Sequence, residues 1–597
     1  MSNLHWDLNS LYSGFDAPEF SEDLKTLEKT IHEFNSWTEE HLAGEDPVAA
    51  LEGYISRAQE LRKLSSRLGA FTSLTLSVDS HHDDARKIQN RLRSFSGEMT
   101  KPPVRLIQYL KGLGDLDGAI ATSSILKEHE FFLKEQKHKA DHLLTEKEEI
   151  IISRMRNTGS AAFSTMQQDL TANLMIEVEV EGETKELPLA AVRNLAYHKD
   201  GRVRRNAYER ELAAYAQVEE ASAAALNAIK GEVITVADLK GYQDPMEETL
   251  LDSRMTRGTL DALISAMEEY LPWFRKYLKR KGELLGYTDG LPFYEMFAPV
   301  GEISLSYSYD EAMDYIVDNF RGFSPRLAEF AASAHEQKWL DVEPRAGKRG
   351  GAFCMNLPAI GESRIMANFS GSFSNMTTLA HELGHAYHGL NLKDESILNT
   401  SYPMPIAETA SIFNETIITN AALKEADPAE KLAILESALA KDNQVITDIY
   451  SRYLFETGLF SQRRDSTLSV AQLKELMLDS QKKAYGDGLD SAFLHPYMWV
   501  NKPHYYRAGL SWYNFPYAFG ILFAKGLYAR YLEMGEAFLP LYDRLLSETG
   551  RKDIRDLCAS VGIDIEDPAF FRSSLELLKQ DIMAFLEMTD KDKGSEG

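Results

Sequence analysis

The chain has few cysteines and no long apolar run. Only two cysteines, Cys354 and Cys558, occur among its 597 residues. Secreted proteins of this size often carry more, so a reducing compartment is favoured. No segment reaches the roughly 18 consecutive apolar residues of a membrane-spanning helix. The first residues lack the basic segment and the apolar run of a signal peptide. These absences predict a cytoplasmic protein with no membrane partner.

Basic residues are also in the minority. The 65 lysines and arginines are outnumbered by 91 aspartates and glutamates, which gives a formal net charge of -26. Nucleic acids and anionic membranes are bound through basic patches, so the sequence predicts neither as a partner. Hydrophobic residues make up 44% of the chain and charged residues 26%, as in an ordinary globular protein with a large core.

Helical periodicity fills most of the chain. Residues 20–42, 46–75 and 82–112, for example, carry apolar residues three or four positions apart among charged ones. Two segments differ. Apolar and acidic residues alternate around a glycine in residues 175–189, which predicts a β-hairpin. Glycines and prolines separate short apolar runs in residues 340–373, which predicts two or three short strands. The predicted fold is therefore mainly α.

Domain boundaries are weakly marked, because the sequence contains no internal repeat and no long low-complexity linker. The most plausible division lies near residue 190. It separates an N-terminal helical region, residues 1–190, which ends in the hairpin, from the remaining region, residues 191–597. The charged tail from residue 590 onwards is predicted to be disordered.

One short motif carries most of the chemical information. His381, Glu382 and His385 form a His-Glu-x-x-His sequence. Residues four apart share one face of a helix, so both imidazoles can bind one ion, and Glu382 can reach a water molecule on that ion. This arrangement is typical of zinc hydrolases. The alternative is two histidines and a glutamate that find ordinary partners in a packed core. Ser374 or Asn375 is predicted to cap the helix.

A catalytic zinc usually has three protein ligands and one open position. The next helix is predicted to start at the prolines just before Glu408, and its apolar neighbours Ile406 and Ala407 argue against a solvated face. Glu408 is therefore the predicted third ligand. Glu415 lies seven residues later on the same face, and we expect it to accept a ring N–H from a ligand histidine. A solvated acidic face is an equally good interpretation of Glu415.

The motif around His381 and the segment that begins at Glu408 together resemble a known family. HELGHAYHG followed by ETASIFNE is similar to the motifs of the thimet oligopeptidase and oligoendopeptidase F metallopeptidases. The resemblance extends to GKRGGAF at residues 347–353, WDLNSLY at residues 6–12, and residues 160–215, which resemble the N-terminal region of oligoendopeptidase F. It thus spans nearly the whole chain.

The resemblance implies a fold and a set of roles. His381, His385 and Glu408 would bind one Zn²⁺ per chain, and Glu382 would be the general base. The fold would be a mainly helical, two-lobed metallopeptidase around a deep channel, with the short sheet near the active site. Residues 191–597 would form the catalytic zinc peptidase domain. Such a channel admits short unstructured peptides as substrates and excludes folded proteins.

Peptide hydrolysis also needs donors for the oxyanion of the tetrahedral intermediate. Residues 495–520 are rich in histidine and tyrosine, and the resemblance assigns His504 and Tyr513 as transition-state stabilisers. Relatives often show further tyrosines where this chain has phenylalanine and proline. The second tyrosine is therefore either Tyr506 or Tyr517, and both are candidate substrate-binding residues.

Four further residues are candidates for substrate binding. Gly351, Ala352 and Phe353 can pair with an extended peptide by strand addition, because glycine lets a ligand backbone approach closely. Phe353 as an ordinary core residue is an equally good interpretation. His388, one turn after His385, either contacts substrate or orients its neighbours.

The sequence therefore predicts a zinc-dependent endopeptidase that hydrolyses internal bonds of short unstructured oligopeptides, with Glu382 activating a zinc-bound water. One alternative is a zinc exopeptidase that holds a terminal carboxylate through Lys502 or Arg507. Another is a non-catalytic peptide-binding protein with a structural zinc, although a structural site usually has four protein ligands. The oligomeric state is not predicted.

Overall fold

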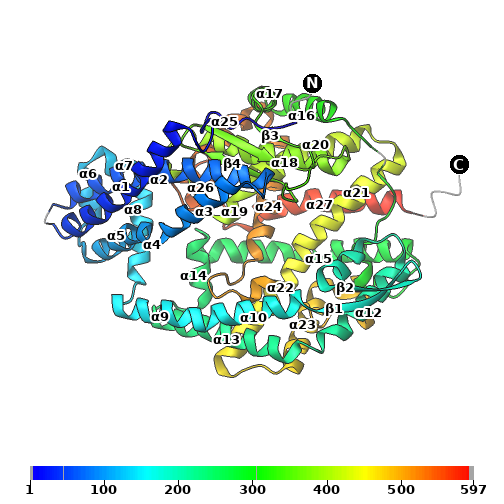
Figure 1. Cartoon of the computed structure of the whole chain (residues 1–597). Helices are drawn as coiled ribbons and strands as arrows, with labels where there is room; N and C mark the ends of the chain where they lie inside the picture. Colours follow the sequence, from blue (N-terminus) through cyan, green and yellow to red (C-terminus); the bar gives the residue numbers. More distant parts are fainter. Residues whose placement is uncertain (1–3, 45, 304, 591–597) are drawn as a thin grey trace. The chain divides into compact units, whose positions relative to one another are not determined.

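The computed structural model describes residues 4–44, 46–303 and 305–590 (Figure 1). Most of the tail predicted to be disordered, residues 591–597, lies outside the described residues. Helices dominate the described chain, with a two-stranded and a three-stranded sheet between them. The prediction of a mainly α fold with a hairpin and a short sheet is confirmed. No described helix is both long and apolar enough to cross a membrane.

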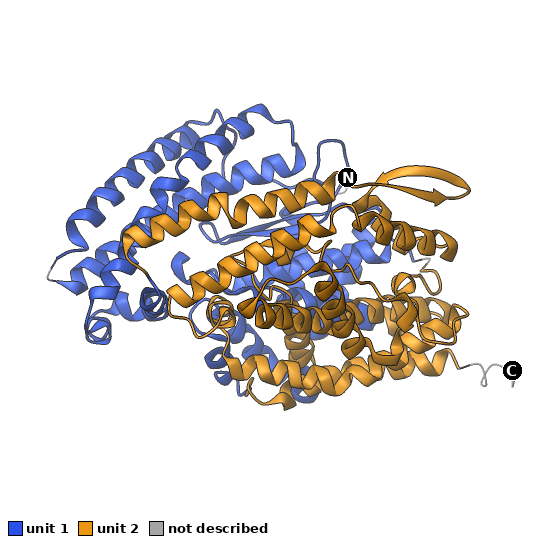
Figure 2. Cartoon of the chain, turned by 90° about the horizontal axis from the view of Figure 1, so that it is seen from below, with its two compact units in different colours: residues 1–143, 304–421, 530–563 blue, residues 144–303, 422–529, 564–597 orange. Residues whose placement is uncertain are grey.

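The chain forms two compact units, each built from segments far apart in the sequence (Figure 2). Unit 1 comprises residues 1–143, 304–421 and 530–563, and unit 2 comprises residues 144–303, 422–529 and 564–597. The predicted division at residue 190 is a division along the sequence and stays a prediction, as does the channel.

Unit 1 packs N-terminal helices against a segment that contains the three-stranded sheet. Its N-terminal helices are α1 (Pro18–His41), α2 (Pro47–Val78), α3 (Asp83–Ser94), α4 (Ser96–Met99), α5 (Lys101–Gly112), α6 (Leu116–Thr122), α7 (Ser124–Glu128) and α8 (Glu130–Asp141). Its later helices are α16 (Tyr309–Phe323), α17 (Pro325–Glu336), α18 (Phe373–Asn391), α19 (Met404–Ala407), most of α20 (Thr409–Glu425), α25 (Leu539–Glu548) and α26 (Ile554–Ala559).

The sheet of unit 1 leads directly into α18 (Figure 1). Strand β5 (Glu362–Met366) is central; it pairs parallel with β3 (Leu340–Asp341) and antiparallel with β4 (Phe353–Leu357). The amide of Asn356 on β4 donates to the carbonyl of His385 on α18, at 3.3 Å. A Cβ at Gly389 would lie 2.4 Å from the Asn356 side chain, so a glycine there lets β4 pack closely on α18. Strand β4 is therefore an edge strand held against the motif helix.

Unit 2 contains the hairpin and most of the long helices. Strands β1 (Met175–Val180) and β2 (Glu183–Pro188) pair antiparallel, and Ile176 and Val178 are buried, as the alternation predicts. The N-terminal half contributes α9 (Glu146–Thr158), α10 (Ser160–Ala172), α11 (Leu189–Asn194), α12 (Gly201–Tyr215), α13 (Glu219–Leu239), α14 (Pro245–Asp252) and α15 (Arg257–Leu284). The later helices are α21 (Pro428–Asn443), the π-helix η4 (Gln444–Asp448), α22 (Ile449–Asp465), α23 (Val470–Tyr485), most of α24 (Phe515–Met534) and α27 (Pro568–Met588).

Candidate active site

Helix α18 carries the His-Glu-x-x-His motif, and its start differs from the prediction. Ser372 is the N-cap: its hydroxyl accepts from the N–H of Asn375, whose side chain accepts from the N–H of Ser372. Asn375 is thus the third helical residue of a capping box, and Ser374 lies inside the helix. The sequence offers several polar residues here, and only the backbone conformation selects among them.

Three side chains of unit 1 converge beside this helix. The Nε2 atoms of His381 and His385 lie 3.2 and 3.5 Å from Oε2 of Glu408. One potential ligand atom from each residue lies within 4.8 Å of the other two, and among the described residues this is the group that could hold a metal ion. All three side chains are half-buried. The predicted ligands are therefore close together in the structure.

The position of Glu408 depends on a break in the helix that the prolines start. Helix α19 ends at Ala407, and Glu408 precedes α20, where its carbonyl accepts from the N–H of Ile412 at 3.0 Å. The hydroxyl of Ser411 donates to the Glu408 carboxylate at 2.9 Å. On α20, Oε2 of Glu415 lies 3.4 Å from Nδ1 of His381, the contact expected of a residue that orients a ligand histidine.

Gly384 determines how closely these elements approach. A Cβ at this position would lie 2.4 Å from the carbonyl oxygen of Ala410 and 2.5 Å from Cα of Ser411. Both atoms belong to the backbone and cannot rotate away. The glycine between the two histidines therefore permits the contact that brings Glu408 to them.

Replacing Gly384 by alanine tests this contact. We expect Gly384→Ala to lower the free energy of unfolding by about 1–3 kcal/mol, the usual cost of overpacking, and to weaken any metal binding by His381, His385 and Glu408, because Glu408 is displaced. Thermal unfolding and zinc competition with a chelator measure both effects. Gly322→Ala on α16 is the matched control, because nothing lies within 4 Å of its added Cβ. A Gly384→Ala protein with the stability and zinc affinity of the parent would contradict the argument.

The protonation of the site follows from burial and charge. Burial raises the pKa of Glu382 to about 7, against the opposing effects of His381 and the backbone N–H of Cys354. Burial also opposes ionisation of Glu408, but the hydrogen bond from His381 and the two imidazoles lower its pKa to about 2. Burial disfavours the charged form of His381 too, yet Glu408 and Glu415 raise its pKa to about 9. The carboxylates of Glu408 and Glu415 thus favour a positive charge on the His381 ring.

The edge strand β4 runs beside Glu382. The backbone N–H of Cys354 on this strand is close enough to lower the pKa of the Glu382 carboxyl. Just before the strand, Gly351 is exposed and has a φ of +80°, a conformation that favours glycine. Ala352 and Phe353 are half-buried, and Phe353 packs against the helical core of unit 1. The Phe353 side chain is thus a core contact, while its backbone lies on the edge strand.

His388 lies in the interior of unit 1. Its side chain is fully buried, its ring stacks on Tyr402 at 4.1 Å, and its Nε2 lies 2.9 Å from the hydroxyl of Thr549. Burial lowers the pKa of His388 to about 3. These surroundings favour the orienting role over substrate contact. Tyr402 itself was not singled out from the sequence, where only its position beside Pro403 marks it.

The remaining predicted residues belong to unit 2. His504 lies on the 3-10 turn η7 (Pro503–Tyr506), and its ring centroid is 4.8 Å from that of Tyr513. Tyr517 meets Tyr513 edge-on at 5.5 Å, and all three rings are half-buried. Tyr506 is fully buried in the core of this unit. The geometry favours Tyr517 over Tyr506 as the second tyrosine.

The sequence also matches models of known families. The model of peptidase family M3 covers residues 194–577, and that of oligopeptidase F covers residues 114–175. The chain belongs to peptidase family M3. It is therefore a metallo-oligopeptidase, and the resemblance to oligoendopeptidase F found in its motifs is confirmed.

Individual relatives of this M3 peptidase match along most of their length. The chain is 22% identical to an oligoendopeptidase F homolog of Lactococcus lactis, over 98% of both chains. It is also 22% identical to oligopeptidase PepF of Bacillus subtilis, over 96% of this chain and 88% of that one. The crystal structure of oligoendopeptidase F from Enterococcus faecium shares the fold, with a TM-score of 0.69, 18% identity, and coverage of 96% and 98%.

Proposed function

We propose that this M3 peptidase is a zinc endopeptidase that hydrolyses internal bonds of short unstructured oligopeptides. One observation carries the proposal: donor atoms of His381, His385 and Glu408 lie within 4.8 Å of one another beside a buried Glu382. Two imidazoles and one carboxylate are a ligand set typical of catalytic zinc in peptidases.

The residues present suit Zn²⁺ chemically. In the described part of the chain, the group comprises three protein donors rather than the four of a structural site. Glu415 beside Nδ1 of His381 supplies the hydrogen-bond acceptor that usually fixes a ligand histidine. When bound, zinc supplies a Lewis acid that acidifies water and polarises a carbonyl oxygen.

Glu382 is the proposed general base and acid. Its carboxylate takes a proton from the attacking water and then gives it to the leaving amine. Burial supports this role, because it raises the pKa of Glu382 to about 7, where the group can both accept and donate a proton near neutral pH.

His504 and Tyr513 are the proposed donors to the oxyanion. Burial and the charges of Arg452, Arg507 and Lys502 lower the pKa of His504, so that its imidazole is neutral at pH 7. A neutral imidazole and a phenol donate hydrogen bonds. Tyr517, half-buried and next to Tyr513, is the proposed second tyrosine. The family resemblance of residues 495–520 supports these assignments.

The backbone of residues 351–353 is the proposed contact for extended substrate. An edge strand offers main-chain donors and acceptors to an added strand, and β4 is such an edge. Main-chain pairing needs an unfolded substrate segment, which is consistent with short peptides as substrates.

Peptides blocked at both ends test the endopeptidase proposal. We expect acetylated and amidated peptides of increasing length to be cleaved at internal bonds, with positions identified by mass spectrometry. A chelator should abolish cleavage and Zn²⁺ should restore it. Cleavage restricted to peptides with a free terminus would show an exopeptidase instead, and cleavage that persists after metal removal would reject the zinc proposal.

A further inference from the structure

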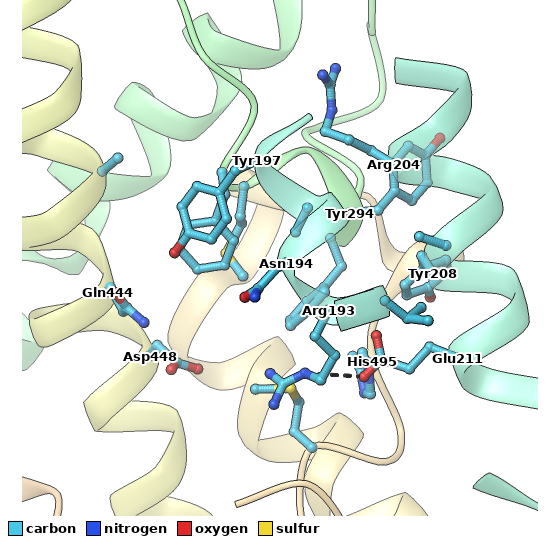
Figure 3. A pocket seen from close by; sticks show the side chains of 18 of the residues that line it. Arg193, Asn194, Tyr197, Arg204, Tyr208, Glu211, Tyr294, Gln444, Asp448 and His495 are labelled. Carbon is cyan, nitrogen blue, oxygen red and sulfur yellow. Dashed lines mark ion pairs between the residues drawn. The ribbon is translucent and has the colours of Figure 1, made fainter. Parts of the chain in front are cut away.

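Unit 2 contains a cavity of about 320 Å³ for which the proposed mechanism names no ligand (Figure 3). Its wall is formed by α11, α12, the π-helix η4, α22 and the segment around residues 495–502. π-Helical turns are rare and often occur at functional sites. Here the π-helix contributes Gln444 and Asp448 to the wall, and Asn194 faces them in Figure 3.

Both carboxylates of the wall have cationic partners. Arg193 pairs with Glu211 at 3.2 Å (Figure 3). Glu211 also accepts from the hydroxyl of Tyr215 at 2.7 Å. Asp448 pairs with Arg452. The negative charges of Glu211 and Asp448 are therefore balanced within the wall.

Arg204 is balanced as well, because its Nε donates to Glu295 at 2.7 Å. Its charge therefore does not add to the cavity. Among the described cations that line the cavity, Lys502 is therefore the one whose charge is not balanced by an ion pair.

Lys502 lines the same cavity, and its side-chain ammonium has no hydrogen-bond or ion-pair partner among the described residues. Its ammonium is influenced by Arg193 and Arg452 as well as by Glu211 and Asp448, and burial lowers its pKa to about 7. Nearby, Nε of Arg452 is buried and has no hydrogen-bond partner. A cation that is partly removed from water and lacks a partner is unfavourable, so this wall favours an added anion.

We infer that this cavity binds a small carboxylate, with Lys502 as its counter-ion. The single unbalanced charge suits a monovalent anion, and the amides of Asn194 and Gln444 offer further donors. Apolar wall residues accommodate the rest of the ligand, among them Phe293, Phe297, Ala440 and Met498. The volume lies at the lower end for ligand pockets and suits one or two amino-acid residues. The ligand is therefore either the C-terminus of a short peptide or a free organic acid.

Calorimetric titration of the full chain tests the inference. The protein is zinc-loaded and carries Glu382→Gln, which is expected to slow hydrolysis of the peptide probes during the titration. The probes are N-acetyl-alanyl-alanine, its C-terminal amide, and butyrate. We expect one acid molecule to bind per chain, and Lys502→Met to weaken that binding at least tenfold. Lys502→Arg should retain most of the affinity, and Lys482→Met, which removes an exposed lysine of α23, should change nothing.

The outcomes separate the two ligand sources. Tighter binding of the peptide acid than of butyrate identifies a peptide terminus, and the reverse order identifies a free acid; both support a carboxylate site. Equal binding of the peptide acid and its amide would overturn the inference of a carboxylate site. Full affinity in Lys502→Met would also overturn it, because a carboxylate that is held at the zinc would not need Lys502. Thermal unfolding checks the fold: Lys502→Met removes a half-buried, unpaired charge and should unfold at the same or a higher temperature than the parent.

Discussion

Glu382→Gln should bind zinc like the parent and hydrolyse peptides roughly 10²–10⁴-fold more slowly, the range that general acid–base catalysis contributes. The amide keeps the size of the side chain but cannot take a proton from water. Glu382 is 6% exposed, so bulk solvent does not readily replace it. Metal analysis and kcat with an end-blocked peptide measure the two properties separately.

The matched control for this variant is Glu329→Gln on α17, which changes an exposed glutamate of the same unit. It should leave both zinc content and kcat unchanged. Wild-type kcat in Glu382→Gln would remove Glu382 from the mechanism. Loss of zinc from Glu382→Gln would show that Glu382 also contributes to metal binding, in addition to transferring a proton.

Glu408→Ala should reduce zinc affinity by at least about 100-fold, since even residues that only orient ligands change metal affinity 10–100-fold. The two imidazoles remain, but they lose the carboxylate that lies 3.2 Å from His381 and 3.5 Å from His385. Activity should fall with the metal and return in part at excess Zn²⁺. Competition with a chelator of known affinity measures the change.

Two further variants separate ligand loss from a change of fold or charge. Glu408→Asp keeps the charge but shortens the side chain, so its zinc affinity should be intermediate. Glu329→Ala removes an exposed carboxylate of unit 1 and should bind zinc like the parent. Parental zinc affinity in Glu408→Ala would mean that another group completes the site, and the predicted ligand set would be wrong.

Features encoded in short segments were predictable from the sequence. The four-residue spacing of His381 and His385 places both on one helical face, and the alternation in residues 175–189 predicts the hairpin. Glu408 was identified because apolar neighbours and preceding prolines mark a buried helix start. Each of these inferences needs only local sequence patterns. The family resemblance added the roles of residues that are distant in the sequence.

Other features depend on contacts between distant segments. The close approach at Gly384 requires the backbone of Ala410, and a sequence does not reveal which glycine faces which neighbour. The choice between Tyr506 and Tyr517 depends on which ring the core of unit 2 encloses.

What the sequence by itself determined is therefore the kind of fold, the metal-binding motif and the family, because local periodicity and motif spacing encode them. Only the tertiary structure decided that Glu408 meets both histidines and that His388 is enclosed. It also decided that Lys502 faces a cavity with Arg193 and Arg452, residues far apart along the chain. The physical reason is that burial and charge balance depend on which segments pack together.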